Sequence, residues 1–391
     1  MADQSPRKIV VLGAGVAGIR VALDLHRRIS PHLARIVLID EKDYHQYLHR
    51  IHEVCNVDYG EKDIIVPIPR LIRGRRIEFI KSVVENVDPN RRVVETADGE
   101  ESFDVLVIAL GSHVAYFGIE GLEENCLTLN SFEAAKEIRA KIESLFEEAA
   151  SGRPPRIVIG GGGFTGVELA GELTDWIPTL CKRRGMEPPE HLVTVVEAMP
   201  SILPWWNPEL VKRAQEVLRR RGVDLVLDEP VLKVSEGSME LRSGREMEHD
   251  LLIWTGGVRG DPACGVDFEV RGGRILIDEF CRAQGFEDIY VAGDIACAVD
   301  EETGRPVRPT AHVSMEQAKV VAHNIGASLE GGEMEEYVYR RVGEIVTLGR
   351  TNAVGELFGL NFTGSVAKLV KRLVHLWYVF SIGGFGLLLG V

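Results

Sequence analysis

Two glycine-rich stretches hold the residue pattern best suited to chemistry in this chain of 391 residues, one at residues 13–18 and one at residues 161–166. Both read Gly-x-Gly-x-x-Gly and follow a short β-branched run. In such a unit the first glycine permits a tight turn, the second lets the backbone approach a pyrophosphate, and the third lets the following helix pack closely. Free N–H groups at the helix N-terminus then attract phosphate. Each stretch is therefore predicted to bind a dinucleotide.

An acidic residue completes each unit, because the next predicted strand ends at Asp40 in the first and at Glu197 in the second. A carboxylate at that position accepts hydrogen bonds from ribose hydroxyls. Ala198 and Met199 follow Glu197 without a nearby arginine, so NADH is favoured over NADPH. One glycine turn alone also arises from packing. Two complete units predict a flavin enzyme that uses a nicotinamide cofactor.

Composition sets the outer limits of function. The length suits two or three domains, and 45% hydrophobic with 27% charged residues is typical of a globular protein. A formal net charge of −14 argues against nucleic acid as a partner. The six cysteines, Cys264 and Cys297 among them, form no C-x-x-C pair, so neither a metal site nor a local redox disulfide is expected. No signal peptide fits before the first strand, near residue 8.

Several further segments are expected from their patterns. Residues 131–149 predict an amphipathic helix, and residues 176–191 a long irregular excursion punctuated by prolines. Residues 288–294 predict a buried strand that ends in Gly-Asp, and residues 314–325 a helix. Residues 374–391 form an apolar tail.

These features together resemble a known family. The two glycine loops, the strand end at 109–111 and the Gly293-Asp294 pair are similar to the two-dinucleotide flavoproteins of the pyridine nucleotide-disulfide oxidoreductase superfamily. Closer detail resembles its type II NADH dehydrogenase branch, the single-subunit NADH:quinone oxidoreductases. The matching stretches are residues 43–45, 116–121, 166–173, 253–258 and 348–350.

The resemblance implies an α/β fold with two Rossmann-like dinucleotide-binding domains, for FAD and NADH, and a C-terminal membrane-associating segment. The FAD-binding domain is expected at residues 1–117 and 268–330, and the NADH-binding domain at 118–267. Residues 331–391 are expected to form the membrane and quinone region. The implied activity is hydride transfer from NADH to FAD N5, followed by transfer of two electrons to a quinone without proton pumping.

The resemblance also implies a set of site residues, and no metal site. The expected FAD contacts are Gly13, Gly15, Ala17, Gly18, Asp40, Glu41, Lys42, Val84, Ala109, Gly111, Asp294, Ala311 and His312. The expected NADH contacts are Gly161, Gly163, Phe164, Thr165, Gly166, Glu168, Glu197, Gly256 and Gly257. The expected catalytic residues are Glu168, His312 and Gln317.

Roles follow for two of these side chains and for two further residues. Glu168 orients the nicotinamide or relays protons to the quinone, or else complements the helix dipole. His312 donates a hydrogen bond to the flavin or the quinone, or is a simple loop residue. Glu172, one turn after Glu168, is expected to be structural, and His45 to be either structural or flavin-facing.

The chain departs from the family at the helix beside the flavin and quinone. Members carry an Ala-Gln-x-Ala-x-Gln pattern there, whereas this chain has His312 at the first glutamine and Glu316 at another pattern position. The electron acceptor is thereby left open between a menaquinone or ubiquinone and other acceptors. The alternatives are a sulfide:quinone oxidoreductase, a soluble NADH-dependent ferredoxin, rubredoxin or oxygen reductase, and a flavin-bound NADH sensor.

The C-terminal segment, residues 366–391, predicts contact with a membrane surface. Lys368, Lys371 and Arg372 share one helical face beside an apolar one, which suits a monotopic protein on anionic lipid. Trp377 and Tyr378 suit the lipid–water interface. A location on the cytoplasmic face of the cell membrane follows. A cap on the quinone tunnel, a homodimer contact and a membrane span are the alternatives for the tail.

Overall fold

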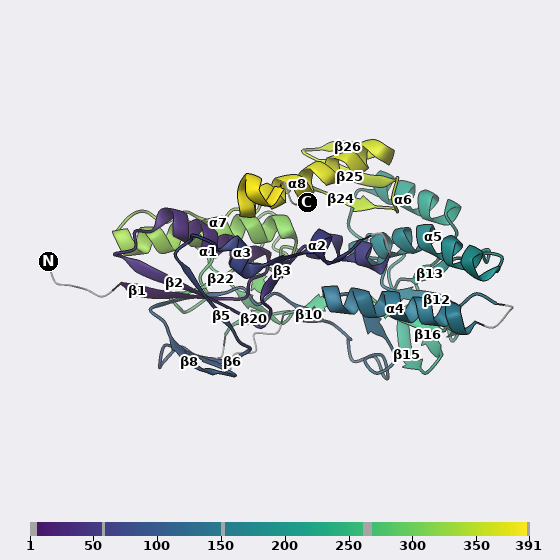
Figure 1. Ribbon diagram of the computed structural model, residues 1–391, viewed down its shortest axis with the longest axis horizontal. Coiled ribbons are helices and arrows are strands. Elements are labelled where there is room, and N and C mark those ends of the chain that lie inside the picture. The colour runs from purple at the N-terminus through teal and green to yellow at the C-terminus, as the bar shows by residue number, and fades with distance from the viewer. Residues whose placement is uncertain (1–5, 57–58, 150–152, 261–267, 389–391) are drawn as a thin grey trace.

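Two five-stranded parallel sheets lie side by side in an elongated molecule (Figure 1). The structure is a computed structural model, and it describes residues 6–56, 59–149, 153–260 and 268–388. In each sheet the central strand, β1 or β12, is the one that precedes a glycine loop. The doubled arrangement confirms the α/β fold predicted from the two glycine loops.

The first sheet has the strand order β22-β9-β1-β2-β5, and every neighbouring pair is parallel. Its strands are nearly continuous runs of buried residues, as expected where helices or other layers cover both faces. The helices α1 and α7 pack together along one face (Figure 1). The bounds are β1 Arg7–Leu12, β2 Ala34–Asp40, β5 Ile77–Lys81, β9 Val105–Ile108, β22 Ile289–Val291, α1 Val16–Arg28 and α7 Ala311–Glu330.

The second sheet repeats this plan with the order β11-β18-β12-β13-β14, again parallel. The helices α4 and α5 pack with each other beside this sheet, and α6 packs against its edge strand β14. The bounds are β11 Leu127–Thr128, β12 Ile157–Gly160, β13 Val193–Val196, β14 Val223–Val226, β18 Leu251–Trp254, α4 Phe132–Glu148, α5 Phe164–Arg184 and α6 Pro208–Arg220.

Smaller elements surround the two sheets. A three-stranded meander is inserted in the first half, another lies in the second half, and a short ladder between β10 and β19 joins the halves. The bounds are β3 Tyr44–Gln46, β4 Ile65–Pro67, β6 Val84–Asp88, β7 Val93–Thr96, β8 Gly99–Ser102, β10 His113–Val114, β15 Val231–Ser235, β16 Ser238–Leu241, β17 Glu246–Glu248, β19 Val258–Arg259, β20 Val270–Arg271, β21 Arg274–Leu276 and β23 Ala296–Cys297.

Three short helical elements follow β3, and one of them lies at the centre of the molecule. This is the 3-10 helix η1, Leu48–Cys55, which contacts both α4 and α5. It is followed by α2, Glu61–Ile64, and, after β4, by α3, Ile68–Leu71.

The C-terminal segment forms a hairpin-like sheet and a long helix that lie across the top of both halves (Figure 1). The strands are β24 Gly343–Thr347, β25 Ala353–Leu357 and β26 Leu360–Thr363, and the helix α8 spans Gly364–Leu388 with a kink at Gly384. Among the described residues, no helix has the length and apolarity needed to cross a bilayer.

Two expected boundaries are wrong. Helix α5 continues through Pro178 to Arg184, so half of the expected excursion at 176–191 is helical. Buried side chains on both sides of the proline, including Ile177 before it and Leu180 after it, keep the helix packed despite the lost backbone hydrogen bond. Helix α7 starts at Ala311 instead of Ser314, because the side chain of Thr310 caps it by accepting a hydrogen bond from Val313 N.

The third glycine of the first loop is required by close packing. A Cβ atom on Gly18 would lie 1.8 Å from the carbonyl oxygen of Gly13, inside the turn between β1 and α1. Gly326, a glycine in the neighbouring helix α7, has its nearest such contact at 4.0 Å, with a side-chain atom of Ile29.

Replacing Gly18 with alanine is expected to lower the free energy of unfolding by about 1–3 kcal/mol, because the loop has to move to relieve the overlap. The matched variant Gly326→Ala has room for its methyl group and favours the helix, so it is expected to be neutral or stabilising by about 0.5–1 kcal/mol. Chemical denaturation of both variants measures the difference. Equal stability of the two would contradict the packing argument.

Candidate active site

The first glycine loop leaves its phosphate-facing side open. Gly13 has φ +92°, and a Cβ there would lie 2.4 Å from the carbonyl oxygen of Ala109, whereas a Cβ on Gly15 would meet nothing within 4 Å. Gly15 caps helix α1 without a side-chain hydrogen bond, so the first N–H groups of the helix stay available for a pyrophosphate. This combination of tight turn, open face and uncapped helix end fits the FAD expected here.

Asp40 holds this loop in place. Its Oδ2 accepts a hydrogen bond from Ala14 N at 2.5 Å, and its Oδ1 accepts one from Lys42 N at 2.7 Å. Burial raises the pKa of Asp40, although these two N–H donors and the Lys42 charge oppose the rise. Lone pairs of the carboxylate remain for a ribose, so Asp40 both positions the loop and fits the predicted contact. The next residue, Glu41, is exposed.

The second glycine loop has the same construction. Gly161 has φ +110°, a Cβ on Gly166 would lie 2.0 Å from Gly161 O, and one on Gly163 would meet nothing within 4 Å. Glu197 accepts from Gly162 N at 2.6 Å through Oε2 and from Met199 N at 2.8 Å through Oε1. The two halves thus tether their loops with equivalent carboxylate bonds, which supports a second dinucleotide site here.

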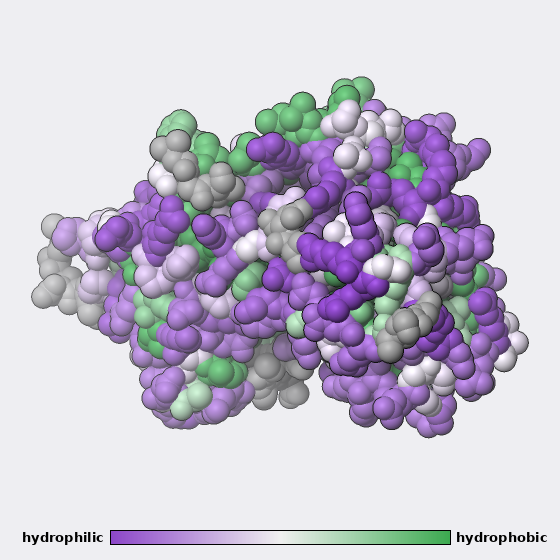
Figure 2. Space-filling model, turned by 45° about the vertical axis from the view of Figure 1, so that its right-hand side comes forward, coloured by the Kyte–Doolittle hydropathy of each residue, from purple (hydrophilic) through white to green (hydrophobic). Residues whose placement is uncertain are grey.

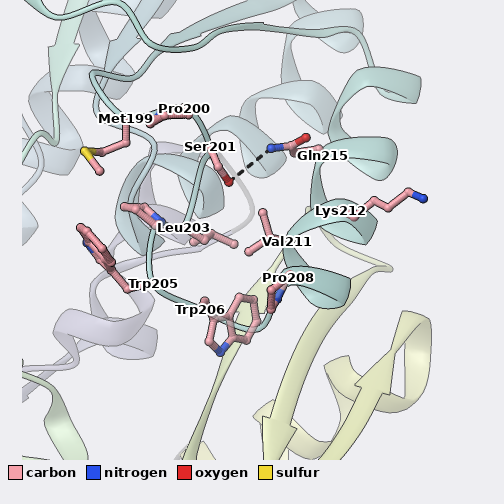
Figure 3. A pocket seen from close by; sticks show the side chains of 11 residues that line it. Met199, Pro200, Ser201, Leu203, Trp205, Trp206, Pro208, Val211, Lys212 and Gln215 are labelled. Atoms are coloured by element: carbon pink, nitrogen blue, oxygen red, sulfur yellow. Dashed lines mark hydrogen bonds between the residues drawn. The ribbon is translucent and has the colours of Figure 1, made fainter. Parts of the chain in front are cut away.

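A shallow cavity of about 420 Å³ opens directly after Glu197, between the loop that leaves β13 and helix α6 (Figure 3). Trp205 projects at its edge and is 69% exposed, while Trp206 packs against Phe164 with ring centroids 5.4 Å apart. Phe164 and Thr165 lie in the first turn of α5, directly after the first glycines of the second glycine loop. The cavity therefore adjoins that loop. Gly256 lies against the turn of the loop, since a Cβ on Gly161 would lie 2.6 Å from Gly256 Cα, and a Cβ on Gly256 itself would collide with the Trp254 ring; Gly257 follows with φ +152°.

The residues expected near the flavin ring lie around the start of α7. Asp294 is half-buried, and its Oδ2 accepts a hydrogen bond from Ser112 Oγ at 3.3 Å. Burial raises the pKa of Asp294. His312 is half-buried in the first turn of α7, next to the exposed Ala311. Gln317, expected to be catalytic, is buried and accepts a hydrogen bond from Gly293 N at 2.9 Å. This contact makes Gln317 a support for the Gly-Asp turn.

Three more of the expected FAD contacts lie at strand ends of the first half. Ala109 follows β9 and is buried, and Gly111 has φ +79° with open space where a Cβ would be. Val84 is half-buried at the start of β6, against the first core.

Glu168 is the centre of a buried polar cluster that joins four elements. Its Oε1 accepts hydrogen bonds from Thr347 N at 2.9 Å and from Thr347 Oγ1 at 3.0 Å, and it forms an ion pair with Lys371 Nζ. Its Oε2 faces His52 Nδ1 at 3.4 Å. Burial raises the pKa of Glu168, but His52, Lys371 and Thr347 outweigh that effect and the net pKa lies below the usual value. Glu168 is therefore ionised at neutral pH.

The geometry of η1 aligns the histidines of this cluster. A 3-10 helix has three residues per turn, so side chains three apart lie in one row. His49, His52 and Cys55 form such a row in η1. His49 Nε2 lies 2.9 Å from His375 Nδ1 of α8, and His375 Nε2 lies 3.0 Å from Arg50 Nη1. Burial lowers the pKa of His375 to about 4.

A second contact joins α8 to the first glycine loop. Tyr378 OH lies 2.8 Å from His45 Nε2, and His45 Nδ1 lies 2.8 Å from Ala14 O. Burial lowers the pKa of His45 to about 4, so the ring is neutral and bridges the helix and the loop. Tyr378 is thus buried, contrary to the expectation that it meets the lipid interface. Trp377, its neighbour, is exposed as expected.

The structure brings Glu168 together with residues that the sequence pattern did not single out. These are His52, Thr347 and the inward-turned Lys371, which was expected to face lipid. These residues are far apart along the chain, so the sequence does not reveal that they form a cluster. A sequence signal for the inward position of Lys371 does exist, because Lys371 has the helical spacing of the buried residues Ala367, Tyr378 and Ile382 of α8.

Comparison with known proteins places the chain in a class. The family model of the pyridine nucleotide-disulphide oxidoreductases matches residues 7–318, so the chain belongs to that family. Within it, the chain is 34% identical to the type II NADH:quinone oxidoreductase of Staphylococcus aureus and 33% identical to that of Staphylococcus saprophyticus, with 98% of each chain covered. It is therefore a member of the type II NADH:quinone oxidoreductase family.

Solved structures share the fold. The structure of NDH2 from Plasmodium falciparum in complex with NADH superposes with a TM-score of 0.84 at 15% identity, covering 98% of this chain and 97% of that one. The sulfide:quinone oxidoreductase of Aquifex aeolicus superposes with a TM-score of 0.80 at 22% identity, covering 96% and 91%. At these identities the likeness concerns the fold alone.

Glu172, one turn after Glu168, is 1% exposed, and burial raises its pKa from 4.5 to about 7. Lys368 opposes this rise, whereas Glu53 and Asp175 add to it. The folded protein thus binds this proton more tightly than the unfolded chain. Its contribution to stability is complete below about pH 4.5 and is lost as the pH rises to 7.

Glu172→Gln is therefore expected to be more stable than the parent protein above pH 7, by about 3 kcal/mol, and to lose this advantage below about pH 5. Chemical denaturation from pH 4.5 to 8.5 measures the difference between the two curves. Glu240→Gln, at an exposed position, is the control and should follow the parent. A pH-independent difference for Glu172→Gln would contradict the burial of an ionisable carboxyl.

Proposed function

We propose that this chain is a FAD-dependent NADH:quinone oxidoreductase that passes two electrons from NADH to a membrane quinone without pumping protons. The observation that carries the proposal is the doubled glycine loop, in which Asp40 and Glu197 tether equivalent turns. The curated relatives at 33–34% identity are named for this activity. Bound FAD supplies the two-electron chemistry, accepting hydride from NADH and passing electrons to the acceptor.

The two loops are assigned to different cofactors. The first loop, with Asp40 and Asp294, holds FAD, while the second, with Glu197, binds NADH. Residues 1–117 and 268–330 form the FAD-binding domain in this proposal, and residues 118–267 form the NADH-binding domain. The cavity after Glu197 adjoins the predicted ribose contact, which supports docking of the adenosine end of NADH there (Figure 3).

The side chains between the two loops complete the proposal. Glu168 lies in the second turn of α5, at the junction between the NADH-binding sheet, η1 and α8. There it orients the nicotinamide or moves a proton. His312, in the first turn of α7, donates to the flavin or the quinone, and Gln317 holds the neighbouring Gly-Asp turn by accepting a hydrogen bond from Gly293 N.

The cysteines do not favour sulfide chemistry, which requires a redox pair beside the flavin. Cys55, Cys126, Cys181, Cys281 and Cys297 are free thiols in the part of the chain that the structure describes, and Cys264 lies outside it. Burial and the neighbouring Glu123 and Glu124 raise the pKa of Cys126 to about 11, which disfavours the reactive thiolate.

Glu168→Gln tests the active site. The variant removes a buried charge but keeps the shape of the side chain, so we expect FAD binding to persist while turnover with a menaquinone analogue falls about 10–100-fold. Stopped-flow absorbance measures flavin reduction by NADH and reoxidation by quinone separately. An unchanged turnover would make Glu168 structural. Reduction of the parent protein by sulfide but not by NADH would overturn the proposed function.

Helix α8 offers a surface for membrane attachment. Figure 2 shows hydrophobic residues gathered along the upper edge of the molecule, over this C-terminal helix. The side chains exposed there, between 41% and 71%, are Val366, Leu369, Leu373, Val374, Trp377, Phe380 and Phe385. Such an outward apolar face on a helix that packs by its other face is typical of a monotopic protein. We place residues 331–391 at the membrane, on the cytoplasmic face, where a quinone enters.

The triple variant Leu369→Gln, Leu373→Gln, Trp377→Gln is expected to lose most liposome binding, because it removes exposed apolar area while leaving the inner face of α8 intact. Flotation with vesicles of mixed anionic and neutral lipid measures the liposome binding of each variant. The matched control is Leu232→Gln, Val258→Gln, Val270→Gln, whose parent residues are 49–53% exposed on other surfaces. Equal flotation of both triple variants would count against attachment through α8.

A further inference from the structure

The two oxygens of Glu168 have unequal surroundings. Donors from Thr347 and Lys371 converge on Oε1, whereas Oε2 faces the ring nitrogen His52 Nδ1 at 3.4 Å. On its other side the same ring meets Thr347 Oγ1, 3.2 Å from His52 Nε2. Glu168, Thr347 and His52 therefore form a closed ring of contacts, buried at the junction of α5, β24 and η1.

Hydrogen-bond directions in this ring follow from the chemistry of the groups. An ionised carboxylate only accepts, so the Thr347 hydroxyl uses its single hydrogen on Glu168 Oε1. The hydroxyl then accepts from His52, which requires a hydrogen on Nε2. A neutral imidazole carries one N–H, so Nδ1 is left with a lone pair that faces Glu168 Oε2. Two acceptors thus face each other across a position that fits one proton.

We propose that His52 and Glu168 together take up one exchangeable proton at this position during turnover, and that this proton is the one each quinone reduction takes from the protein. The inference rests on the proposed function, whose overall balance is NADH + H⁺ + quinone → NAD⁺ + quinol. NADH supplies both electrons and one proton as hydride, so one further proton must come from outside NADH. His52 is a positioning residue in this scheme, because it acts through Glu168.

The charges around the pair keep the position empty at rest. Burial lowers the pKa of His52. The positive charges of Lys371 and Lys368 on α8 lower it further, while the negative charges of Glu168 and Glu53 oppose this effect. Lys371 also balances the Glu168 carboxylate. His49 on η1 is a further titratable neighbour of His52, and β24 contributes the uncharged hydroxyl of Thr347. The resting pair is a neutral imidazole beside a carboxylate, able to take up one proton when negative charge arrives nearby.

An open cavity lies beside the groups that contact the pair. Thr347 and Lys371, both bonded to Glu168, line this cavity of about 560 Å³ between η1 and α8. His49, Arg50 and His375 line the same cavity. The cavity thus gives solvent a place next to the groups that contact Glu168.

The hydrogen positions can be tested without any cofactor. Two-dimensional NMR of ¹⁵N-histidine-labelled protein distinguishes the two neutral tautomers, and His52→Gln identifies the His52 signals. We expect the Nε2–H tautomer in the parent. Thr347→Val removes the hydroxyl that accepts from Nε2, so in this variant we expect the Nδ1–H tautomer, donating to Glu168. A parent ring in the Nδ1–H form, or the same tautomer in both proteins, would overturn the proposal.

Kinetics test the use of the proton. The amide of His52→Gln still donates to Thr347 but cannot hold a proton toward Glu168. We expect quinone reduction to slow about 10–100-fold and to lose the pH dependence of the parent, with flavin reduction by NADH changed less than about twofold. His249→Gln, at a buried histidine between β17 and β18 that lies outside this cluster, is the control and should keep both rates. Equal slowing of both half-reactions, or of both variants, would overturn the proposal.

The tautomer measurement and the kinetic measurement together distinguish failure of this inference from failure of the proposed function. If the parent protein reduces no quinone, the proposed function fails, while the tautomer measurement still decides where the His52 proton lies. If the parent turns over normally and His52→Gln does too, the proposed function stands and the proton-holding pair is refuted.

Discussion

The burial of the Glu168 carboxylate is the constraint on which the centre of this molecule depends. An isolated carboxylate taken out of water is destabilised by several kcal/mol unless cations and donors compensate it. Here the compensation comes from three separate parts of the chain, through His52, Thr347 and Lys371. The half built on the first sheet, the half built on the second sheet and the C-terminal segment must therefore all be in place before this charge is stable. One buried charge thus links the assembly of both sheets with the docking of α8.

The two dinucleotide sites are built alike but connected differently. In each, a carboxylate at the end of the second strand holds the glycine loop by a backbone N–H, so loop shape does not depend on a bound cofactor. Helix α8 reaches the backbone of the first loop, through Tyr378 and His45 to Ala14 O. The second loop opens beside a shallow cavity. This difference suits a cofactor that stays in the first site and a substrate that exchanges in the second.

Local features of this protein were predictable from its sequence, and contacts between distant segments were not. The glycine loops, Asp40, Glu197 and the buried strands follow from short-range patterns that each determine their own backbone. Glu168 was singled out from its place after the second loop. Its partners His52, Thr347 and Lys371 were missed because only the tertiary fold brings them together. The path of α5 through Pro178 was missed for the same reason, since tertiary packing outweighs a local helix breaker.

The 3-10 helix η1 has a consequence for how this family member can diverge. Its row of His49, His52 and Cys55 depends on a repeat of three residues. One inserted or deleted residue inside η1 would rotate everything beyond it by about 120° and turn the row away from α5 and α8. Surface loops elsewhere absorb changes in length, but this segment tolerates only exchange of side chains. We therefore expect the length of η1 to be the most strictly conserved length in the chain, and to be conserved more strictly than the identities of its residues.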